Sequence, residues 1–220
     1  MADNEREGVI KYRLDYHTGH APDEALIRPL AVWRGILRAV GLVGQDPARY
    51  DGLGFGNLSR RTGSPDPSGS VPPFVISGSQ TGYLPHLGSE HFCMVRHCVP
   101  DRNALTADGL IMPSSEALTH GAIYAARPHI GFVFHAHDPA IWSHADALGI
   151  PVTPVDVAYG TPEMAAAVRR LFDETDAETR GLFAMGGHPD GVVAFGDTAR
   201  EAGTRLIAAL AEARELAAAS

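Results

Sequence analysis

Two histidines separated by one residue stand out in the stretch HIGFVFHAHDP, which begins at residue 129. If this stretch is a strand, His135 and His137 project from one face, about 6.5–7 Å apart along the chain. Two imidazoles at that spacing can converge on one metal ion with bonds of ~2.0–2.1 Å. Neutral imidazole suits Zn²⁺, and also Fe²⁺, Co²⁺ or Mn²⁺. The pair indicates a metal site, with two ordinary hydrogen-bonded histidines as the alternative.

A third ligand must come from elsewhere in a chain that holds 11 histidines among 220 residues. His188 is the best candidate, because it lies in a glycine-rich turn, MGGHPDG, just before an expected strand. His144 and His120 compete for the same role. His120 follows Glu116 by four residues, and on a helix this spacing places both side chains on one face. His120 could therefore contact the groups around the metal instead of binding the metal itself.

The segment MPSSEALTH, residues 112–120, could bind an anion. We expect a helix over residues 114–126, with Ser114 or Ser115 as its N-cap and Glu116 in its first turn. Exposed N–H groups and the helix dipole attract anions at such a helix start. Taken alone, however, the segment is better explained as an ordinary N-cap followed by an acidic first turn.

Two further segments are rich in glycine and hydroxyl residues: GFGNLSRR at residues 54–61 and ISGSQTG at residues 76–82. Both could cradle phosphate or hydroxyl groups. Neither matches a Walker loop or a dinucleotide-binding fingerprint. Taken alone, each segment predicts a turn.

Expected helices and strands alternate along the chain, which favours an α/β fold. In the histidine strand, period-two alternation predicts that Ile130, Phe132 and Phe134 face a core, opposite to His135 and His137. The residues 62–73 are rich in serine, glycine and proline and predict an exposed loop. We expect further helices at residues 23–40, from Thr161 onward and at 198–216, and strands at residues 74–76, 92–95, 129–137 and 192–195.

The composition is that of a soluble globular chain, with 45% hydrophobic and 20% charged residues. A net charge of −8, from 18 basic and 26 acidic residues, argues against nucleic-acid binding. Apolar runs are far shorter than the ~20 residues of a membrane span. The first ten residues lack the pattern of a secretory signal, so we expect a cytoplasmic protein. Cys93 and Cys98 are expected to be free thiols, because a single C-x₄-C pair is weak evidence for zinc.

Taken in order, these segments resemble the class II aldolase/adducin family. The matching motifs are GFGNLSRR, SQTG, PSSE, HAH and GGHPDG, and the 19-residue step from Glu116 to His135 is also the family's usual one. The resemblance covers roughly residues 25–215. It implies a three-layer α/β/α sandwich around a mostly antiparallel central sheet. We expect a single domain over residues 1–220, with residues 1–22 as an N-terminal extension.

The resemblance also implies roles for individual residues. His135, His137 and His188 would be the metal ligands, with Zn²⁺ as the first expectation and Mn²⁺, Co²⁺ or Fe²⁺ as others. Glu116 would be the catalytic carboxylate that moves a proton while the metal stabilises an enediolate. The residues expected to hold a substrate phosphate, or the acid group that replaces it, are Asn57, Thr81, Gly82, Ser114 and Ser115.

Two departures from the family pattern stand out. The aldolases carry a tyrosine, supplied by a neighbouring subunit, after the His-x-His strand. Here that position holds Val155 or Asp156, and Tyr159 is a candidate substitute. The second departure is GGHPDG, where Pro189 and Asp190 separate the histidine from the next glycine.

The implied function is a divalent-metal-dependent lyase, an enzyme that performs retro-aldol cleavage of a small hydroxy-carbonyl, sugar-phosphate-like substrate. The alternatives are a decarboxylase, dehydratase or epimerase on the same metal core, a non-catalytic adducin-like assembly domain, and an unrelated zinc hydrolase or oxidoreductase. The family usually forms homotetramers. Arg60 and Arg61 are the local cations near the expected anion site, so a carboxylate or an unphosphorylated substrate is also possible.

Overall fold

A computed structural model describes residues 8–64 and 71–219 of the chain. The described residues form an eight-stranded sheet in the order β1-β7-β6-β5-β4-β8-β10-β9. Each neighbouring pair is antiparallel except β1 and β7, which run parallel. The strands of this sheet are β1 (Arg13–Thr18), β4 (Asn57–Arg61), β5 (Phe74–Ser77), β6 (Phe92–Val99), β7 (Ala104–Gly109), β8 (Phe132–His137), β9 (Leu182–Ala184) and β10 (Gly191–Gly196). A separate pair joins β2 (Gly44–Gln45) to β3 (Gly54–Phe55).

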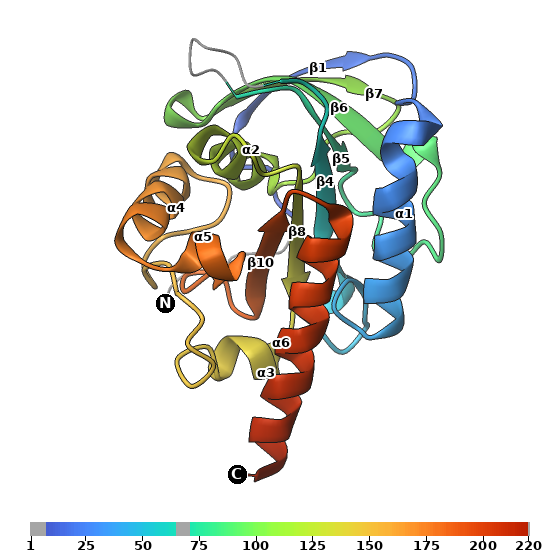
Figure 1. The fold of residues 1–220 in the computed structure, drawn as a ribbon. Helices are drawn as coiled ribbons and strands as arrows, with labels where there is room; N and C mark the ends of the chain where they lie inside the picture. Colours follow the sequence, from blue (N-terminus) through green and yellow to red (C-terminus); the bar gives the residue numbers. More distant parts are fainter. Residues whose placement is uncertain (1–7, 65–70, 220) are drawn as a thin grey trace.

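Helices cover both faces of this sheet (Figure 1). Two hydrophobic cores lie between the layers, one on each face. The expected three-layer α/β/α sandwich around a mostly antiparallel sheet is therefore confirmed. One core packs against α2 (Ala117–Ala126), α4 (Pro162–Glu174) and α5 (Ala177–Arg180), and the other against α1 (Glu24–Ala39), α3 (Pro139–Ser143) and α6 (Ala199–Ala219). Short 3₁₀ helices lie at Tyr50–Gly52, Ser89–His91 and Pro100–Arg102.

The predicted helix starts at Asp23 and Thr161 are confirmed. Asp23 caps α1 by accepting a 2.8 Å hydrogen bond from the Ala25 N–H. Thr161 caps α4 in the same way, with proline at the first helical position. Pro29 lies inside α1 and has no N–H for the Ala25 carbonyl. Arg60 donates to that carbonyl instead, at 3.1 Å, and so stabilises the helix across this gap.

The helix predicted over residues 114–126 begins later than expected. Glu116, rather than Ser114 or Ser115, is its N-cap residue, and α2 starts at Ala117. Ser114 is held outside the helix because its N–H donates to the Ser77 carbonyl at 3.2 Å. The serines therefore extend a loop against β5, and Glu116 is positioned at the end of α2.

The histidine strand is shorter than predicted at its N-terminal end. Strand β8 begins at Phe132, because Ile130 lies in a turn and its N–H donates to the Arg127 carbonyl. Ile130 consequently packs in the same core as Val133, and its predicted face was wrong. The alternation holds for the strand itself, since Phe134 packs in the opposite core.

Several strands lie in segments for which the sequence predicts turns or an N-terminal extension. GFGNLSRR contributes β3 and β4, and the residues before position 22 contribute the edge strand β1. Residues 1–7 of the expected extension and 65–70 of the expected loop lie outside the described residues. Among the described helices, none is both long and apolar enough to cross a membrane.

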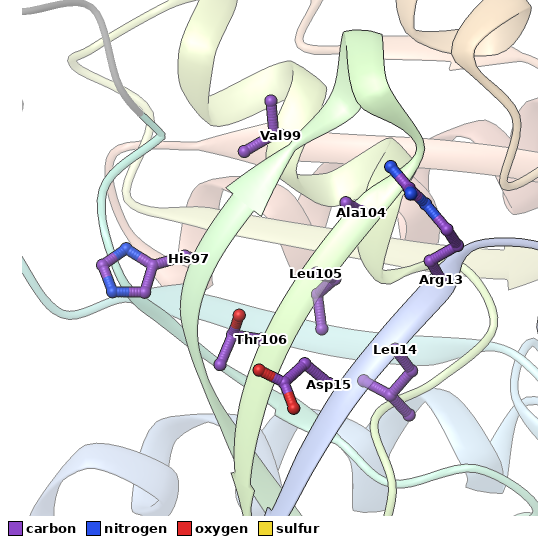
Figure 2. A pocket seen from close by; sticks show the side chains of 8 residues that line it. All are labelled: Arg13, Leu14, Asp15, His97, Val99, Ala104, Leu105 and Thr106. Carbon is purple, nitrogen blue, oxygen red and sulfur yellow. The ribbon is translucent and has the colours of Figure 1, made fainter.

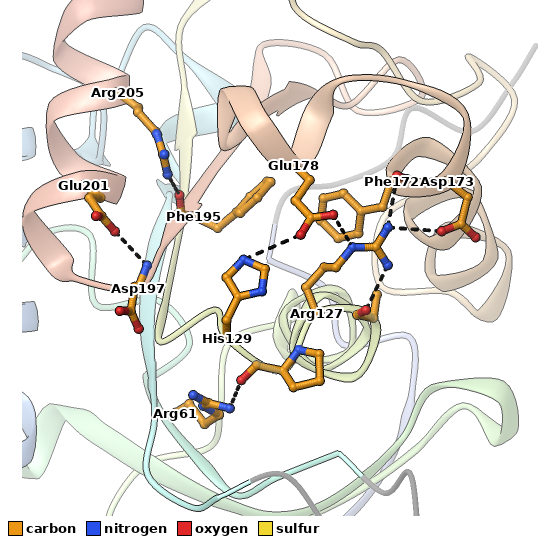
Figure 3. Close-up of polar contacts among 12 residues, drawn as sticks. Arg61, Arg127, His129, Phe172, Asp173, Glu178, Phe195, Asp197, Glu201 and Arg205 are labelled. Carbon is orange, nitrogen blue, oxygen red and sulfur yellow. Dashed lines mark hydrogen bonds and ion pairs between the residues drawn. The ribbon is translucent and has the colours of Figure 1, made fainter.

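Arg127 fastens the far end of α2 to the neighbouring helices (Figure 3). Its Nε donates to a Glu178 carboxylate oxygen at 2.5 Å, and its Nη2 donates to the Phe172 carbonyl and the Asp173 carboxylate. Arg127 is about one-fifth exposed, so these ion pairs are partly shielded from solvent. They hold α2 at one end while Glu116 lies at the other.

Candidate metal centre

Strand pairing in the middle of the sheet brings the histidines together. Strand β8 lies between β4 and β10, and His135 and His137 point to the same face of it. His137 lies opposite Gly191 of β10, and His188 lies in the turn three residues earlier. The third ring therefore reaches the pair through the antiparallel pairing of β8 with β10.

The three rings form a compact group. The Nε2 atoms of His135 and His137 are 2.9 Å apart, and one ligand nitrogen from each of the three residues lies within 4.8 Å of the others. His135 and His137 are fully buried, and His188 is 4% exposed. Bonds of ~2.0–2.1 Å from three nitrogens at this separation suit one divalent transition-metal ion.

The close approach of these rings requires glycine at position 191. A Cβ atom there would lie 2.7 Å from Cδ2 of His188 and 3.3 Å from Cε1 of His135. The preceding residue, Asp190, has a φ of +64°, an uncommon value for a residue with a side chain. Despite Pro189 and Asp190, the second departure from the family pattern, the turn still directs His188 at the pair.

Burial keeps these imidazoles neutral. It lowers the pKa of His135 to about 4, partly offset by its hydrogen bond to the Val192 carbonyl. Burial also lowers the pKa values of His137 and His188, and nearby histidines lower them further. A neutral imidazole has a lone pair for a metal, so the buried group is ready to coordinate at neutral pH.

The backbone also determines which nitrogen of His135 carries the proton. Its Nδ1 lies 3.2 Å from the Val192 carbonyl oxygen, which can only accept. The proton is therefore on Nδ1, and the Nε2 lone pair faces His137. Support of this kind, by a carbonyl behind the ring, orients a metal-ligating histidine.

Glu116 contributes a carboxylate beside the histidines. Its side chain is 1% exposed, and Oε1 lies 3.8 Å from Nε2 of His188. It reaches this place from the N-cap of α2. A buried carboxylate next to three imidazoles can serve as a proton carrier at the site.

A polar pocket brings together the five residues expected to hold an acid group. Thr81 and Gly82 are anchored by Arg34, which donates to their carbonyl oxygens at 3.2 and 3.0 Å. Gly82 allows close packing of the loops, since a Cβ there would lie 2.2 Å from the Gly44 carbonyl oxygen. The pocket is lined by Gly8, Gly54, Gly56, Asn57, Gly78, Ser79, Gln80, Thr81, Gly82, Ser114 and Ser115.

The competing histidines are placed elsewhere. His144 contacts the Ala140 carbonyl within its own helix region, at 2.9 Å from Nδ1. His120 is buried with its Nδ1 2.7 Å from the Ser59 hydroxyl, which also lies 2.7 Å from the Tyr124 hydroxyl. In the part of the chain that the structure describes, His135, His137 and His188 are the group with metal-binding geometry. Cys93 and Cys98 are free, buried thiols.

The expected cations Arg60 and Arg61 do not face the polar pocket's anion site as predicted. Arg60 donates to carbonyls of α1, and its guanidinium lies 5.5 Å from the centroid of the Phe132 ring. Arg61 donates to the Pro128 carbonyl (Figure 3). Both guanidinium groups therefore stabilise the fold by hydrogen bonds to backbone carbonyls.

A second polar group, not predicted from the sequence, lies beside His137. The Tyr50 ring packs edge-on against the His137 ring at 4.8 Å, and its hydroxyl donates to Asp190 at 2.7 Å. Arg49 donates to the Tyr50 hydroxyl at 2.7 Å and to the His137 carbonyl at 3.2 Å. Tyr50 and Asp51 both have positive φ. The Asp51-Gly52 dipeptide, a turn signal, was the weak indication of this in the sequence.

Tyr159 lies on the other side of the histidines. Its ring centroid is 4.6 Å from that of His188, and its hydroxyl is bonded to the backbone of Val9. Val155, which with Asp156 is one of the two residues that the resemblance places at the position of the family's tyrosine, is 80% exposed.

A separate hollow lies on the sheet where β1, β6 and β7 meet (Figure 2). Arg13, Asp15, His97 and Thr106 point around it. Among the described residues, these side chains do not form a group with metal-binding geometry. The chemistry-bearing side chains thus gather at the histidines and the polar pocket.

Solved structures with the same fold include aldolases. L-fuculose-1-phosphate aldolase from Thermus thermophilus is 19% identical with a TM-score of 0.61, covering 87% of this chain and 92% of that one. Sugar-phosphate aldolase from Thermotoga maritima is 18% identical with a TM-score of 0.64, covering 87% and 93%. YgbL from Klebsiella pneumoniae, a putative aldolase/epimerase/decarboxylase, is 19% identical with a TM-score of 0.60, covering 86% and 87%. A comparison with curated protein sequences finds no match.

The family follows from a sequence match over most of the chain. Residues 47–216 match the model of the class II aldolase and adducin N-terminal domain. The chain belongs to this family, as its motifs suggested. Membership in it indicates an enzyme of the lyase type that acts on a small molecule.

Proposed function

We propose that this protein is a divalent-metal-dependent lyase that cleaves a small hydroxy-carbonyl compound carrying an acid group. The observation that carries the proposal is the buried cluster of three neutral imidazoles with the Glu116 carboxylate beside it. An adducin-like assembly domain needs no such group. A metalloprotease-type hydrolase would place two histidines and a glutamate on one helix, whereas here the pair is on a strand.

His135, His137 and His188 would hold the ion, with Zn²⁺ as the first candidate and Mn²⁺, Co²⁺ or Fe²⁺ as others. When bound, the ion supplies a Lewis acid that polarises oxygen atoms of the substrate. Three protein ligands leave coordination positions for those oxygens. The surrounding protein excludes water from the rings, which strengthens electrostatic interactions there.

Glu116 would move the proton. Its carboxylate lies 3.8 Å from His188 and is shielded from solvent, so a substrate placed at the ion lies within its reach. The polar pocket of Asn57, Thr81, Gly82, Ser114 and Ser115 would hold the acid group of the same molecule. The pocket and the histidines share a wall, because Asn57 is paired with His135 across β4 and β8.

Retro-aldol cleavage of a sugar-phosphate-like substrate is the first candidate reaction. Decarboxylation, dehydration or epimerisation is the second candidate, because the family's aldolases use a tyrosine where this chain is expected to carry Val155 or Asp156. Tyr159 is already engaged with Val9 and packs on His188, so it is placed to orient a ligand rather than to replace that tyrosine. We also expect a homo-oligomer, with the tetramer as the first candidate.

A substrate panel with Glu116→Gln as the matched control tests the proposal. The panel contains ketose 1-phosphates and small hydroxy acids, and the readouts are aldehyde and ketone products and released CO₂. We expect turnover by the metal-loaded protein and a loss of about 10²–10⁴-fold in the variant, with metal content and fold unchanged. Full activity in Glu116→Gln would remove this carboxylate from the mechanism, and turnover that survives complete metal removal would overturn the proposal.

A further inference from the structure

Two residues beside the candidate metal centre have a backbone conformation that residues with side chains rarely adopt. Tyr50 has a φ of +49° and Asp190 a φ of +64°. A positive φ is uncommon outside glycine, and for a bulky residue such as tyrosine it is a clear outlier. Such conformations persist only where surrounding contacts hold them, and they gather at functional sites. The two residues lie 140 positions apart in the chain, yet a hydrogen bond joins their side chains.

Asp190 lies in the turn that carries the third candidate ligand. The Gly191 N–H donates to the His188 carbonyl at 2.9 Å, which closes a four-residue turn. Pro189 is at the second position of this turn and Asp190 at the third. Proline followed by a positive φ is typical of a type II turn, whose third position usually holds glycine or asparagine. The aspartate therefore needs contacts that keep it in this conformation.

Two hydrogen bonds hold Asp190, one to its backbone and one to its side chain. Its carbonyl accepts from the N–H of Asp138, the residue that follows His137, at 2.9 Å. Its carboxylate oxygen Oδ2 accepts from the Tyr50 hydroxyl at 2.7 Å. Asp190 thus links the turn of His188 to the end of strand β8 and to the loop that carries Tyr50.

Tyr50 in turn is fixed against the second candidate ligand. Its ring packs edge-on against the His137 ring, with 4.8 Å between the centroids, and against the Phe55 ring at 5.2 Å. Arg49 donates to the Tyr50 hydroxyl at 2.7 Å and to the His137 carbonyl at 3.2 Å. The Arg49 guanidinium also lies 4.6 Å from the centroid of the Phe55 ring. The hydroxyl that reaches Asp190 is therefore held in place from the side of His137.

The hydrogen bond between Tyr50 and Asp190 acts on the middle of the turn. Backbone bonds hold the two ends of the turn. The middle is nearer the solvent, since Asp190 is half-buried. The Tyr50 hydroxyl fixes the side chain of this middle residue. It consequently limits how far the turn, and the His188 ring with it, can move away from His137.

We propose that Tyr50, through its hydrogen bond to Asp190, is a positioning residue that holds the His188 ring at its distance from His137 in the metal centre. This inference rests on the proposed function, because it concerns the metal centre on which that function depends. Removing a contact that orients a metal ligand typically costs about 10–100-fold in metal affinity. The pair is only half-buried, so we expect a loss at the lower end of this range.

Zinc affinity tests the inference without turnover. Tyr50→Phe keeps the ring against His137 and removes only the hydroxyl, so the dissociation constant for Zn²⁺, measured by competition with a chromophoric chelator, should rise about 10-fold. Tyr16→Phe is the matched control, because the Tyr16 hydroxyl also donates at 2.7 Å, to the Gly109 carbonyl, from the edge strand β1. Both variants lose one comparable hydrogen bond, so a general loss of stability affects them alike. Equal zinc affinity in the two variants would overturn the inference.

The acceptor provides a second, independent set of variants. Asp190→Gly keeps the positive φ and removes the acceptor, so it should raise the dissociation constant by about the same factor as Tyr50→Phe. Asp190→Asn tolerates the same backbone conformation and keeps an oxygen that accepts from the hydroxyl, so it should retain most of the affinity. Combining Tyr50→Phe with Asp190→Gly should weaken zinc binding no more than either change alone, because both remove the same bond. Additive losses would contradict the inference.

The metal-free protein supplies a readout that does not depend on the proposed function. In a ¹H–¹³C spectrum of protein labelled in its histidines, the Cε1–H signal of His188, assigned with His188→Gln, should shift in Tyr50→Phe and not in Tyr16→Phe. If the natural chain binds no zinc at these rings, the proposed function fails, and this spectrum still decides whether Tyr50 positions His188. An unchanged His188 signal in Tyr50→Phe would overturn the inference whether or not zinc binds.

Discussion

At the scale of single residues, the candidate metal centre depends on a glycine as much as on its histidines. Gly191 lies beside the rings of His188 and His135, and its missing side chain leaves the space that they occupy. Backbone pairing holds Gly191 opposite His137, so the strand cannot move away without breaking the sheet.

Gly191→Ala should therefore weaken metal binding. The added methyl group must displace the His188 or His135 ring, and we expect the dissociation constant for Zn²⁺ to rise about 10–100-fold, the effect typical of disturbing the support of a ligand. Competition with a chromophoric chelator measures the constant, and circular dichroism confirms that the fold is kept. A variant that binds zinc as tightly as the natural chain would show that the rings do not need this space.

The sequence predicted the candidate ligands at this scale but not all of their neighbours. The His-x-His spacing follows directly from the two-residue period of a strand. The approach of His188 was inferred from glycines and a resemblance, because it depends on the pairing of β8 with β10. The Tyr50–Asp190 hydrogen bond joins residues 140 positions apart, so local patterns carry no information about it.

At the scale of elements, the packing of α1 against α6 offers a matched pair of glycines. Gly203 of α6 faces Trp33 of α1, and a Cβ there would lie 2.1 Å from the Trp33 ring. Gly35 is exposed in the middle of α1, and a Cβ there would meet nothing within 4 Å.

The two alanine substitutions should change stability in opposite directions. Gly203→Ala forces the helices apart and should lower the free energy of unfolding by about 1–3 kcal/mol. Gly35→Ala removes a flexible residue from a helix interior and should raise it by about 0.5–1 kcal/mol. Urea denaturation measures the free energy of unfolding of both variants. A Gly203→Ala variant as stable as the natural chain, or more stable, would show that α1 and α6 do not pack as described.

Helices and strands were predicted correctly where local capping and periodicity determine them. They were predicted wrongly where contacts with distant segments determine the structure. Asp23 and Thr161 begin helices because each caps its own N-terminus. GFGNLSRR resembles a turn in isolation, yet Asn57–Arg61 form a central strand because β5 and β8 flank them. The start of α2 was misplaced because the Ser77 carbonyl holds Ser114 out of the helix.

At the scale of the whole molecule, several buried neutral histidines make stability depend on pH. Burial lowers the pKa of His135 from 6.5 to about 4 and also lowers the pKa values of His120, His137 and His188. Between pH 6.5 and 4 the unfolded chain binds protons that the native protein does not. Stability is therefore fully present above pH 6.5 and is lost as the pH falls through this range.

We expect the metal-free protein to lose stability steadily on acidification from pH 7.5 to 4.5. His135 alone contributes on the order of 3 kcal/mol between these limits. Urea unfolding in the presence of a chelator, at several pH values, measures the change. Adding Zn²⁺ should raise stability at pH 7.5 and do so much less at pH 5, because protons compete for the ligands. Stability that is flat or rises toward pH 5 would contradict the neutral, buried state of the cluster.

The claim on which the function depends is that three imidazoles hold one cation. Anomalous X-ray diffraction at the zinc absorption edge, on crystals of the zinc-loaded protein, tests it most directly. The structure predicts a single strong peak, bonded to nitrogen atoms of His135, His137 and His188, with Glu116 adjacent and at least one further position open. A peak elsewhere, or no peak between these rings at saturating zinc, would contradict the metal centre and the lyase function with it.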